Sequence, residues 1–132
     1  MRTGRCYCGD IRYEIPDEVR NETLCHCSMC RGTTGAPCVA WVTVARASLR
    51  FTLGVPTSFR SSAHGTRSFC ARCGTQLTFA DDTTLEEIDV TICSLDAPQA
   101  VPPRDHTFTG SALPWMPVAD GLPHYRRTRS EG

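Results

Sequence analysis

The stretch Cys70-Ala71-Arg72-Cys73-Gly74 decides how the rest of the sequence is interpreted. Two cysteines separated by two residues and followed by glycine are typical of a zinc knuckle, in which both thiolates converge from one tight turn. Gly74 permits the left-handed backbone that leaves N–H groups free to donate to sulfur. One knuckle supplies half of a tetrahedral site, so a structural zinc ion needs two further ligands.

The isolated pair Cys6 and Cys8 is the best candidate to complete the site with Cys70 and Cys73. We therefore predict a closed structural zinc site with four thiolate ligands. An alternative pairing joins the knuckle to two cysteines of the 25–30 segment and leaves the first pair without metal. The spacings match no ferredoxin pattern, which makes an iron–sulfur cluster a weaker interpretation.

A second cluster is formed by Cys25, Cys27 and Cys30 in the sequence CHCSMC. Three thiolates can hold a zinc ion from one side and leave its fourth position to water or an incoming ligand. We thus predict two zinc ions per chain, with the second at a reactive site. His26 lies between two of these ligands, and an extended backbone there would point it away from the metal. Cys38 and Cys93 lie in apolar stretches and are predicted to be core residues.

Composition excludes several classes of function. The 132 residues carry 14 Lys plus Arg against 14 Asp plus Glu, so no net positive charge favours nucleic acid or an anionic membrane. All 14 cations are arginine, which excludes covalent catalysis through a lysine Schiff base. We expect no nucleic-acid partner and no membrane partner, and the sequence does not indicate an oligomeric state.

The first ten residues, MRTGRCYCGD, contain no apolar signal segment, and no run of 18 apolar residues occurs. These features predict a cytoplasmic protein. In a reducing compartment clustered cysteines bind metal more often than they form disulfides, and the odd count of nine fits disulfides poorly.

Hydrophobic residues alternate with polar ones at a period of two, which predicts a mainly β fold. The strand candidates are 11–15, 39–44, 49–53, 58–61, 76–79 and 88–92. One helical turn is expected after Cys27, and an extended wrapping segment after Pro98. We predict a single domain over residues 1–125 and a flexible arginine-rich tail over 126–132.

Motifs along most of the chain resemble the glutathione-dependent formaldehyde-activating enzyme and centromere protein V family. They are Gly4–Gly9 (GRCYCG), Cys25–Arg31 (CHCSMCR), Arg67–Thr75 (RSFCARCGT), Ser94–Asp96, Pro103–Phe108, Trp115 and Asp120–Pro123. The resemblance implies a β-tent of small coiled antiparallel sheets organised around the zinc knuckle. It also implies the same division of the cysteines into a structural site and a looser second zinc site.

The activity implied by this resemblance is that of a carbon–sulfur lyase, which joins glutathione and formaldehyde into S-hydroxymethylglutathione or releases them. The expected partners are a small glutathione-like thiol and a small aldehyde. His106 is a candidate proton donor. Arg31 and Trp115 are candidate substrate-binding residues. The alternative function is a non-catalytic zinc module for protein interaction or for thiol and metal buffering.

Overall fold

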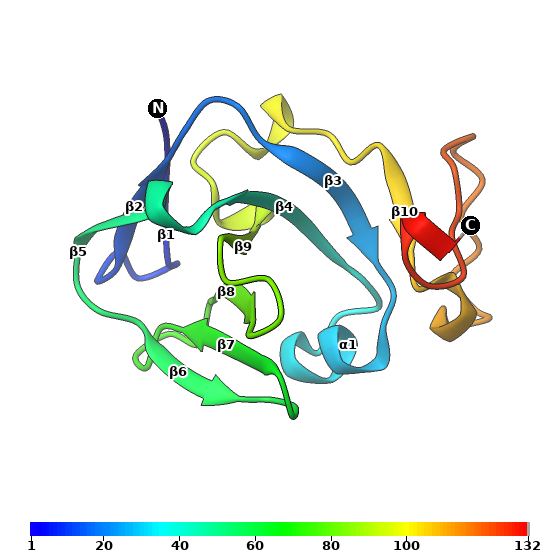
Figure 1. Ribbon diagram of the computed structural model, residues 1–132, viewed down its shortest axis with the longest axis horizontal. Helices are drawn as coiled ribbons and strands as arrows, with labels where there is room; N and C mark the ends of the chain where they lie inside the picture. Colours follow the sequence, from blue (N-terminus) through cyan, green and yellow to red (C-terminus); the bar gives the residue numbers. More distant parts are fainter. Residues whose placement is uncertain (132) are drawn as a thin grey trace.

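The computed structural model describes residues 1–131 and shows a mainly β protein. Within these residues, ten strands form one sheet of three strands and one of seven. The smaller sheet has the order β1-β2-β5, and its strands are β1 (Arg2–Arg5), β2 (Arg12–Ile15) and β5 (Arg50–Leu53). In Figure 1 this sheet lies at the left, far from β10 and the C-terminus.

The larger sheet has the order β10-β3-β4-β9-β8-β7-β6. Its strands are β3 (Arg20–Cys25), β4 (Val39–Ala45), β6 (Thr57–Arg60), β7 (Gly65–Phe69), β8 (Gln76–Asp81), β9 (Glu87–Thr91) and β10 (Asp105–Thr107). All of its pairs are antiparallel except β10 with β3, which is parallel. The predicted fold class is confirmed, although this sheet is larger and less uniform than a set of small antiparallel sheets.

Helical structure is sparse, as the sequence predicts. The α-helix α1 (Ser28–Thr34) follows the second cysteine cluster, and the thiol of Cys27 accepts from the backbone N–H of Cys30 at its start. It is a turn longer than expected. The remaining helical elements are short 3₁₀ turns, η1 (Arg46–Ser48), η2 (Ile92–Ser94), η3 (Pro98–Ala100), η4 (Thr109–Ser111) and η5 (Arg129–Glu131).

Four strands, β1, β3, β7 and β10, are absent from the sequence prediction. Polar residues dominate them, as in the sequence RNETLC of β3, so no run of apolar residues marks them. Hydrogen bonding to neighbouring strands determines their conformation instead, since β3 pairs with β4 on one side and with β10 on the other. Tertiary pairing therefore overrides weak local propensity here.

The main core lies between the two sheets and includes Tyr13, Ile15, Val42, Leu77 and Val90. A separate cluster contains Cys25, Cys30, Val39 and Trp41, with Phe79 and Phe108 packed against it. Cys93 is exposed on η2 and Cys38 is half-buried, so the prediction that Cys93 is a core residue is wrong. The 3₁₀ turn after β9 rotates this side chain outward, which the apolar pattern alone does not indicate.

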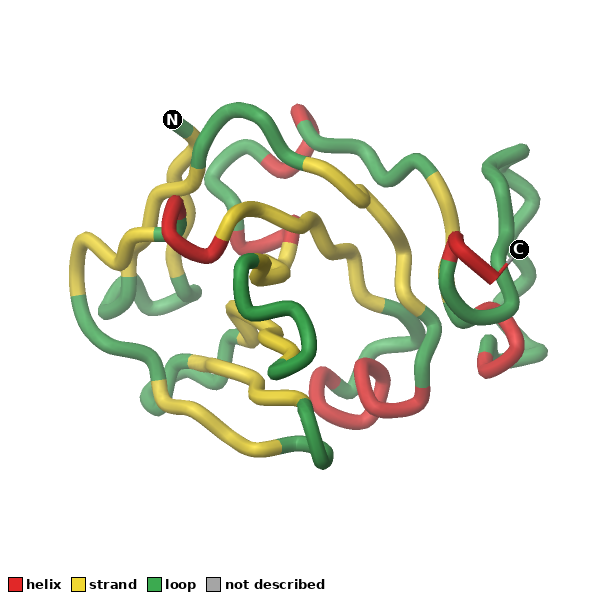
Figure 2. Tube along the Cα trace, in the orientation of Figure 1, coloured by secondary structure: helices red, strands yellow, loops and turns green. Residues whose placement is uncertain are grey.

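Loops dominate the chain after residue 98, as Figure 2 shows. The backbone carbonyls of Arg126 and Arg127 accept from Gly110 and Phe108, and the guanidinium of Arg129 pairs with the Asp105 carboxylate. The segment from 126 to 129 thus lies against β10 and the loop that follows it. The domain boundary at residue 125 stays a prediction. No described helix is long and apolar enough to cross a membrane.

Candidate metal centres and the cavity beside them

The four-cysteine cluster joins two tight turns from distant parts of the sequence. Cys6 and Cys8 lie in the turn between β1 and β2, whereas Cys70 and Cys73 lie in the knuckle between β7 and β8. The four sulfur atoms all lie within 4.8 Å of one another. The Cys6–Cys8 distance of 3.6 Å and the Cys8–Cys70 distance of 3.8 Å match the spacing of about 3.8 Å in a tetrahedral zinc–thiolate site.

The backbone around this cluster is shaped to serve sulfur ligands. Gly9 and Gly74 have φ angles of 84° and 81°, the left-handed conformation that these turns need. The N–H groups of Ile11 and Cys73 donate to the thiols of Cys6 and Cys70. The neighbouring Thr75 hydroxyl lowers the pKa of Cys73 to about 5, because a hydrogen bond favours the thiolate. The donor set and its spacing therefore fit a structural zinc ion.

The three-cysteine cluster is built by the junction between β3 and α1. Cys25 ends β3, Cys27 caps the helix and Cys30 lies in its first turn, and the three sulfurs lie within 4.8 Å of one another. Hydrogen bonds from Cys25 and then Cys30 lower the pKa of Cys27 to about 2, while that of Cys25 is raised. The junction thus favours a thiolate at Cys27, the form that binds metal.

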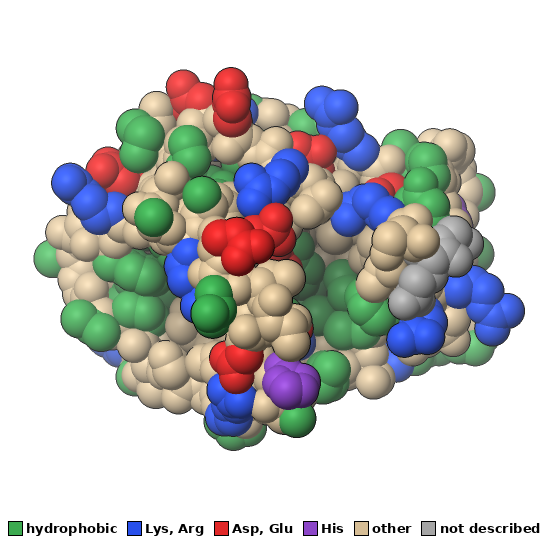
Figure 3. Space-filling model, in the orientation of Figure 1, with side chains coloured by type: hydrophobic (Ala, Val, Ile, Leu, Met, Phe, Trp, Pro, Cys, Tyr) green, Lys and Arg blue, Asp and Glu red, His purple; other side chains and the backbone are tan. Residues whose placement is uncertain are grey.

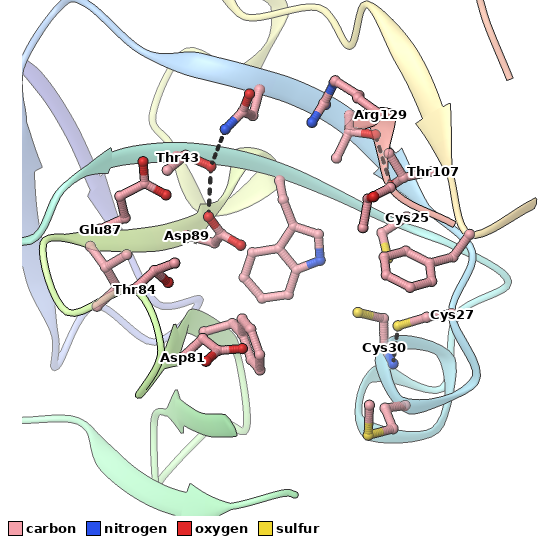
Figure 4. A pocket seen from close by; sticks show the side chains of 18 of the residues that line it. Cys25, Cys27, Cys30, Thr43, Asp81, Thr84, Glu87, Asp89, Thr107 and Arg129 are labelled. Atoms are coloured by element: carbon pink, nitrogen blue, oxygen red, sulfur yellow. Dashed lines mark hydrogen bonds between the residues drawn. The ribbon is translucent and has the colours of Figure 1, made fainter. Parts of the chain in front are cut away.

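A cavity of about 350 Å³ opens directly beside this cluster. Its walls are largely apolar and include Met29, Trp41, Phe79, Ile88 and Phe108. Figure 3 shows a hollow with hydrophobic side chains on this face of the molecule. In Figure 4 the three cysteines lie on one side of the cavity. The cluster therefore has protein on one side and accessible space on the other, as a site with an open ligand position requires.

Arg67 of β7 is a functional candidate that the analysis of single residues missed. Its side chain lines the cavity, is only 3% exposed and donates from Nη2 to the Cys30 sulfur at 3.6 Å. The guanidinium also lies over the Phe79 ring, 4.9 Å from its centroid. Its Nε and Nη1 atoms are buried without a hydrogen-bond partner among the described residues. The signal available in the sequence was its place in the RSFC motif.

The opposite side of the cavity carries carboxylates, which the sequence analysis also missed. Figure 4 shows Asp81, Glu87 and Asp89 there, across from the cysteines. The Thr43 hydroxyl donates to Asp89 at 2.7 Å, and burial raises the pKa of Asp89 to about 6. Asp89 of β9 is directly opposite Thr43 of β4 and Phe79 of β8, which also line the cavity, so the three side chains share one face of the sheet.

The structure does not bring His106, Arg31 or Trp115 to the cavity wall. His106 is fully buried, and its ring nitrogens contact His26 Nε2 at 2.9 Å and Asp120 Oδ2 at 2.8 Å. Arg31 donates to the His26 carbonyl, and Trp115 is 70% exposed. Their proposed roles stay predictions. The prediction that His26 points away from the metal site is confirmed by its contact with His106.

Fold and site together define a class: a small, mainly β domain with one closed and one open cysteine cluster. Residues 1–111 match the model of the family described as glutathione-dependent formaldehyde-activating enzyme, and the chain belongs to this family. Among solved structures, a Rhodobacter sphaeroides protein is 21% identical with a TM-score of 0.62, covering 93% of this chain and 98% of its own. That likeness supports the fold alone. No curated protein matches this chain.

Proposed function

We propose that the protein is a zinc-dependent carbon–sulfur lyase that joins a small aldehyde to a thiol such as glutathione, or cleaves the resulting S-hydroxymethyl adduct. The observation that carries this proposal is the three-thiolate cluster at the wall of an apolar cavity. A closed structural site would not need such a cavity. Family membership supports the same substrates, because the family description names glutathione and formaldehyde.

Cys25, Cys27 and Cys30 would hold the second zinc ion, and the spacing of their sulfur atoms fits one ion. Such an ion, when bound, supplies a Lewis acid that keeps an incoming thiol in its thiolate form at neutral pH. Metal-bound thiolates persist in a reducing compartment, which supports a cytoplasmic location.

The chain's own residues orient the aldehyde and limit water. Trp41, Phe79 and Phe108 supply apolar walls for a short-chain substrate. As the sulfur–carbon bond forms, the carbonyl π electrons move to oxygen, and Arg67 is the charged donor available beside Cys30 to stabilise that alkoxide. Its Nε and Nη1 atoms, which have no hydrogen-bond partner among the described residues, support this role.

The alkoxide must then take up a proton. Asp89 lines the same cavity, and its pKa of about 6 lets it exchange a proton near neutral pH. His106 is less suited to this role, since neither its ring nor that of its neighbour His26 lines the cavity. We therefore assign the proton to Asp89 or to a water molecule that it orients.

The test must separate catalysis from the rapid uncatalysed addition of formaldehyde to thiols. Exchange NMR with ¹³C-formaldehyde and glutathione measures how fast the label moves between free aldehyde and adduct. We expect the zinc-replete protein to accelerate this exchange in proportion to its concentration, and Cys27→Ser to lose the acceleration. An exchange rate equal to that of a protein-free sample would contradict the enzyme and favour the non-catalytic zinc module.

A further inference from the structure

A third cluster of metal-binding side chains lies outside the cavity, near the C-terminal end of the chain. It consists of His106, Asp120 and His124, whose ligand atoms all lie within 4.8 Å of one another. The proposed lyase chemistry uses none of the three. Asp120 and His124 face solvent, so an ion could reach the cluster directly, whereas His106 is fully buried.

Backbone pairing brings the two histidines together and holds them there. His106 and His124 form a parallel β-bridge, in which the His106 N–H donates to Pro123 O at 2.9 Å and its carbonyl accepts from Tyr125 N at 2.8 Å. The two imidazole centroids are consequently 4.6 Å apart. A pair of side chains placed by main-chain hydrogen bonds needs little rearrangement to bind one ion.

Asp120 is oriented by its own turn. Its Oδ1 accepts from the Leu122 N–H at 3.0 Å, which leaves Oδ2 directed at His106 Nε2, 2.8 Å away. Two ligand atoms on one tetrahedral zinc ion are about 3.3 Å apart. An ion that replaces the proton shared by these atoms would therefore need them to separate by only about half an ångström.

Metal-bound histidines usually donate their other ring N–H to an acceptor, and at His106 the available acceptor is a second imidazole. The Nδ1 atom of His106 lies 2.9 Å from Nε2 of the buried His26. With Nε2 on an ion, Nδ1 carries the ring proton and donates a hydrogen bond to His26. This hydrogen bond fixes the ring orientation and the tautomer. A lone surface histidine would lack this support.

We propose that His106, Asp120 and His124 form a third metal site, which binds one divalent transition ion such as zinc with water completing the coordination. Two imidazoles with one carboxylate favour zinc or nickel and disfavour magnesium and calcium, which require oxygen ligands. The ion clamps the segment around residues 120–124 onto β10. This inference does not depend on the proposed lyase function.

The test is calorimetric titration of untagged protein that already carries two zinc equivalents in its cysteine clusters. We expect saturable binding of one further zinc ion per chain, nickel binding at the same site, and no binding of magnesium. Zinc added beyond two equivalents should also raise the melting temperature, because the ion binds the folded state alone. Long-range ¹H–¹⁵N NMR should show the ring nitrogens of two histidines shifting together.

His124→Ala and Asp120→Asn should each weaken this third binding event tenfold or more and remove the zinc-dependent rise in melting temperature. Both side chains are at least partly exposed, so these variants should fold. His64→Ala is the matched control, because His64 is exposed and outside the cluster. Absence of a third equivalent in the parent protein, or unchanged binding by His124→Ala, would overturn the site.

Discussion

The two cysteine clusters have similar ligands but different surroundings. The four-cysteine cluster belongs to the main core, where two turns enclose the sulfurs and backbone N–H groups donate to them. The three-cysteine cluster packs instead with Trp41, Phe79 and Phe108 at the wall of a cavity. The surroundings, as well as the ligands, therefore distinguish a site that stabilises the fold from one that can react.

Loss of a ligand from the four-cysteine cluster should have the largest effect. Cys70→Ser removes one of the sulfurs that join the turn of the first hairpin to the knuckle. Structural zinc contributes on the order of 10 kcal/mol to folding, so this variant should be unfolded or should melt far below the parent protein. Circular dichroism and metal analysis measure both effects.

Cys93→Ser is the control for that experiment, because Cys93 is exposed and belongs to neither cluster. It should melt like the parent and keep its zinc. A Cys70→Ser protein with unchanged melting would show that the four-cysteine cluster has no structural role.

The same substitution in the three-cysteine cluster should separate activity from stability. Cys27→Ser should remain folded, retain one zinc ion and lose at least a hundredfold in aldehyde–thiol exchange, because the open site no longer holds its metal. Metal analysis, melting and exchange NMR on one preparation measure all three quantities. If Cys27→Ser unfolds as Cys70→Ser does, the comparison fails and both clusters are structural.

The sequence predicted this division of the cysteines because ligand spacing is local information. C-x-x-C and C-x-C segments bring sulfurs together through a few backbone angles, and the structure groups them as expected. The cavity opposite could not be predicted in this way. Arg67 and Asp89 reach it from β7 and β9, strands that are distant from α1 in sequence, and only the order of the large sheet brings them together.

The same reasoning explains the positions of His106 and Trp115. Residue type alone makes His106 a candidate proton donor, whereas its position depends on a parallel pairing of β10 with β3 that no local pattern encodes. Trp115 lies in a loop and is exposed, a position that its aromatic side chain does not indicate. Long-range pairing therefore limits what one sequence reveals about a site assembled from several strands.

Arg67 offers a sharper test of what makes the second cluster reactive. Arg67→Met keeps much of the side-chain volume but removes the donors beside Cys30, so kcat should fall about a hundredfold with a smaller change in KM. Arg67→Lys should restore part of the rate. Stability should change little, because Met replaces a buried charge whose remaining N–H groups have no partner among the described residues.

Arg60→Met is the matched control, since Arg60 lies on the neighbouring strand β6, is exposed and does not line the cavity. It should retain the parent rate. Equal losses in the two variants would show that positive charge on the protein in general, rather than a donor inside the cavity, supports the reaction.

The smallest expected effect concerns the carboxylate opposite the cysteines, and it appears as a pH dependence of stability. Burial raises the pKa of Asp89 to about 6, above its value near 4 in the unfolded chain. The neutral acid is therefore favoured in the folded state, and its stabilisation is fully present below pH 4 and is lost as pH rises through 6.

Asp89→Asn cannot ionise, and its amide oxygen can still accept from Thr43. The stability of Asp89→Asn relative to the parent should thus increase by about 1.4 kcal/mol between pH 5 and pH 7.5, measured by urea unfolding. Glu86→Gln removes the same charge from an exposed position outside the cavity and should show a far smaller change. A pH-independent difference for Asp89→Asn would mean that Asp89 is solvated, and the cavity would then lack its assigned proton carrier.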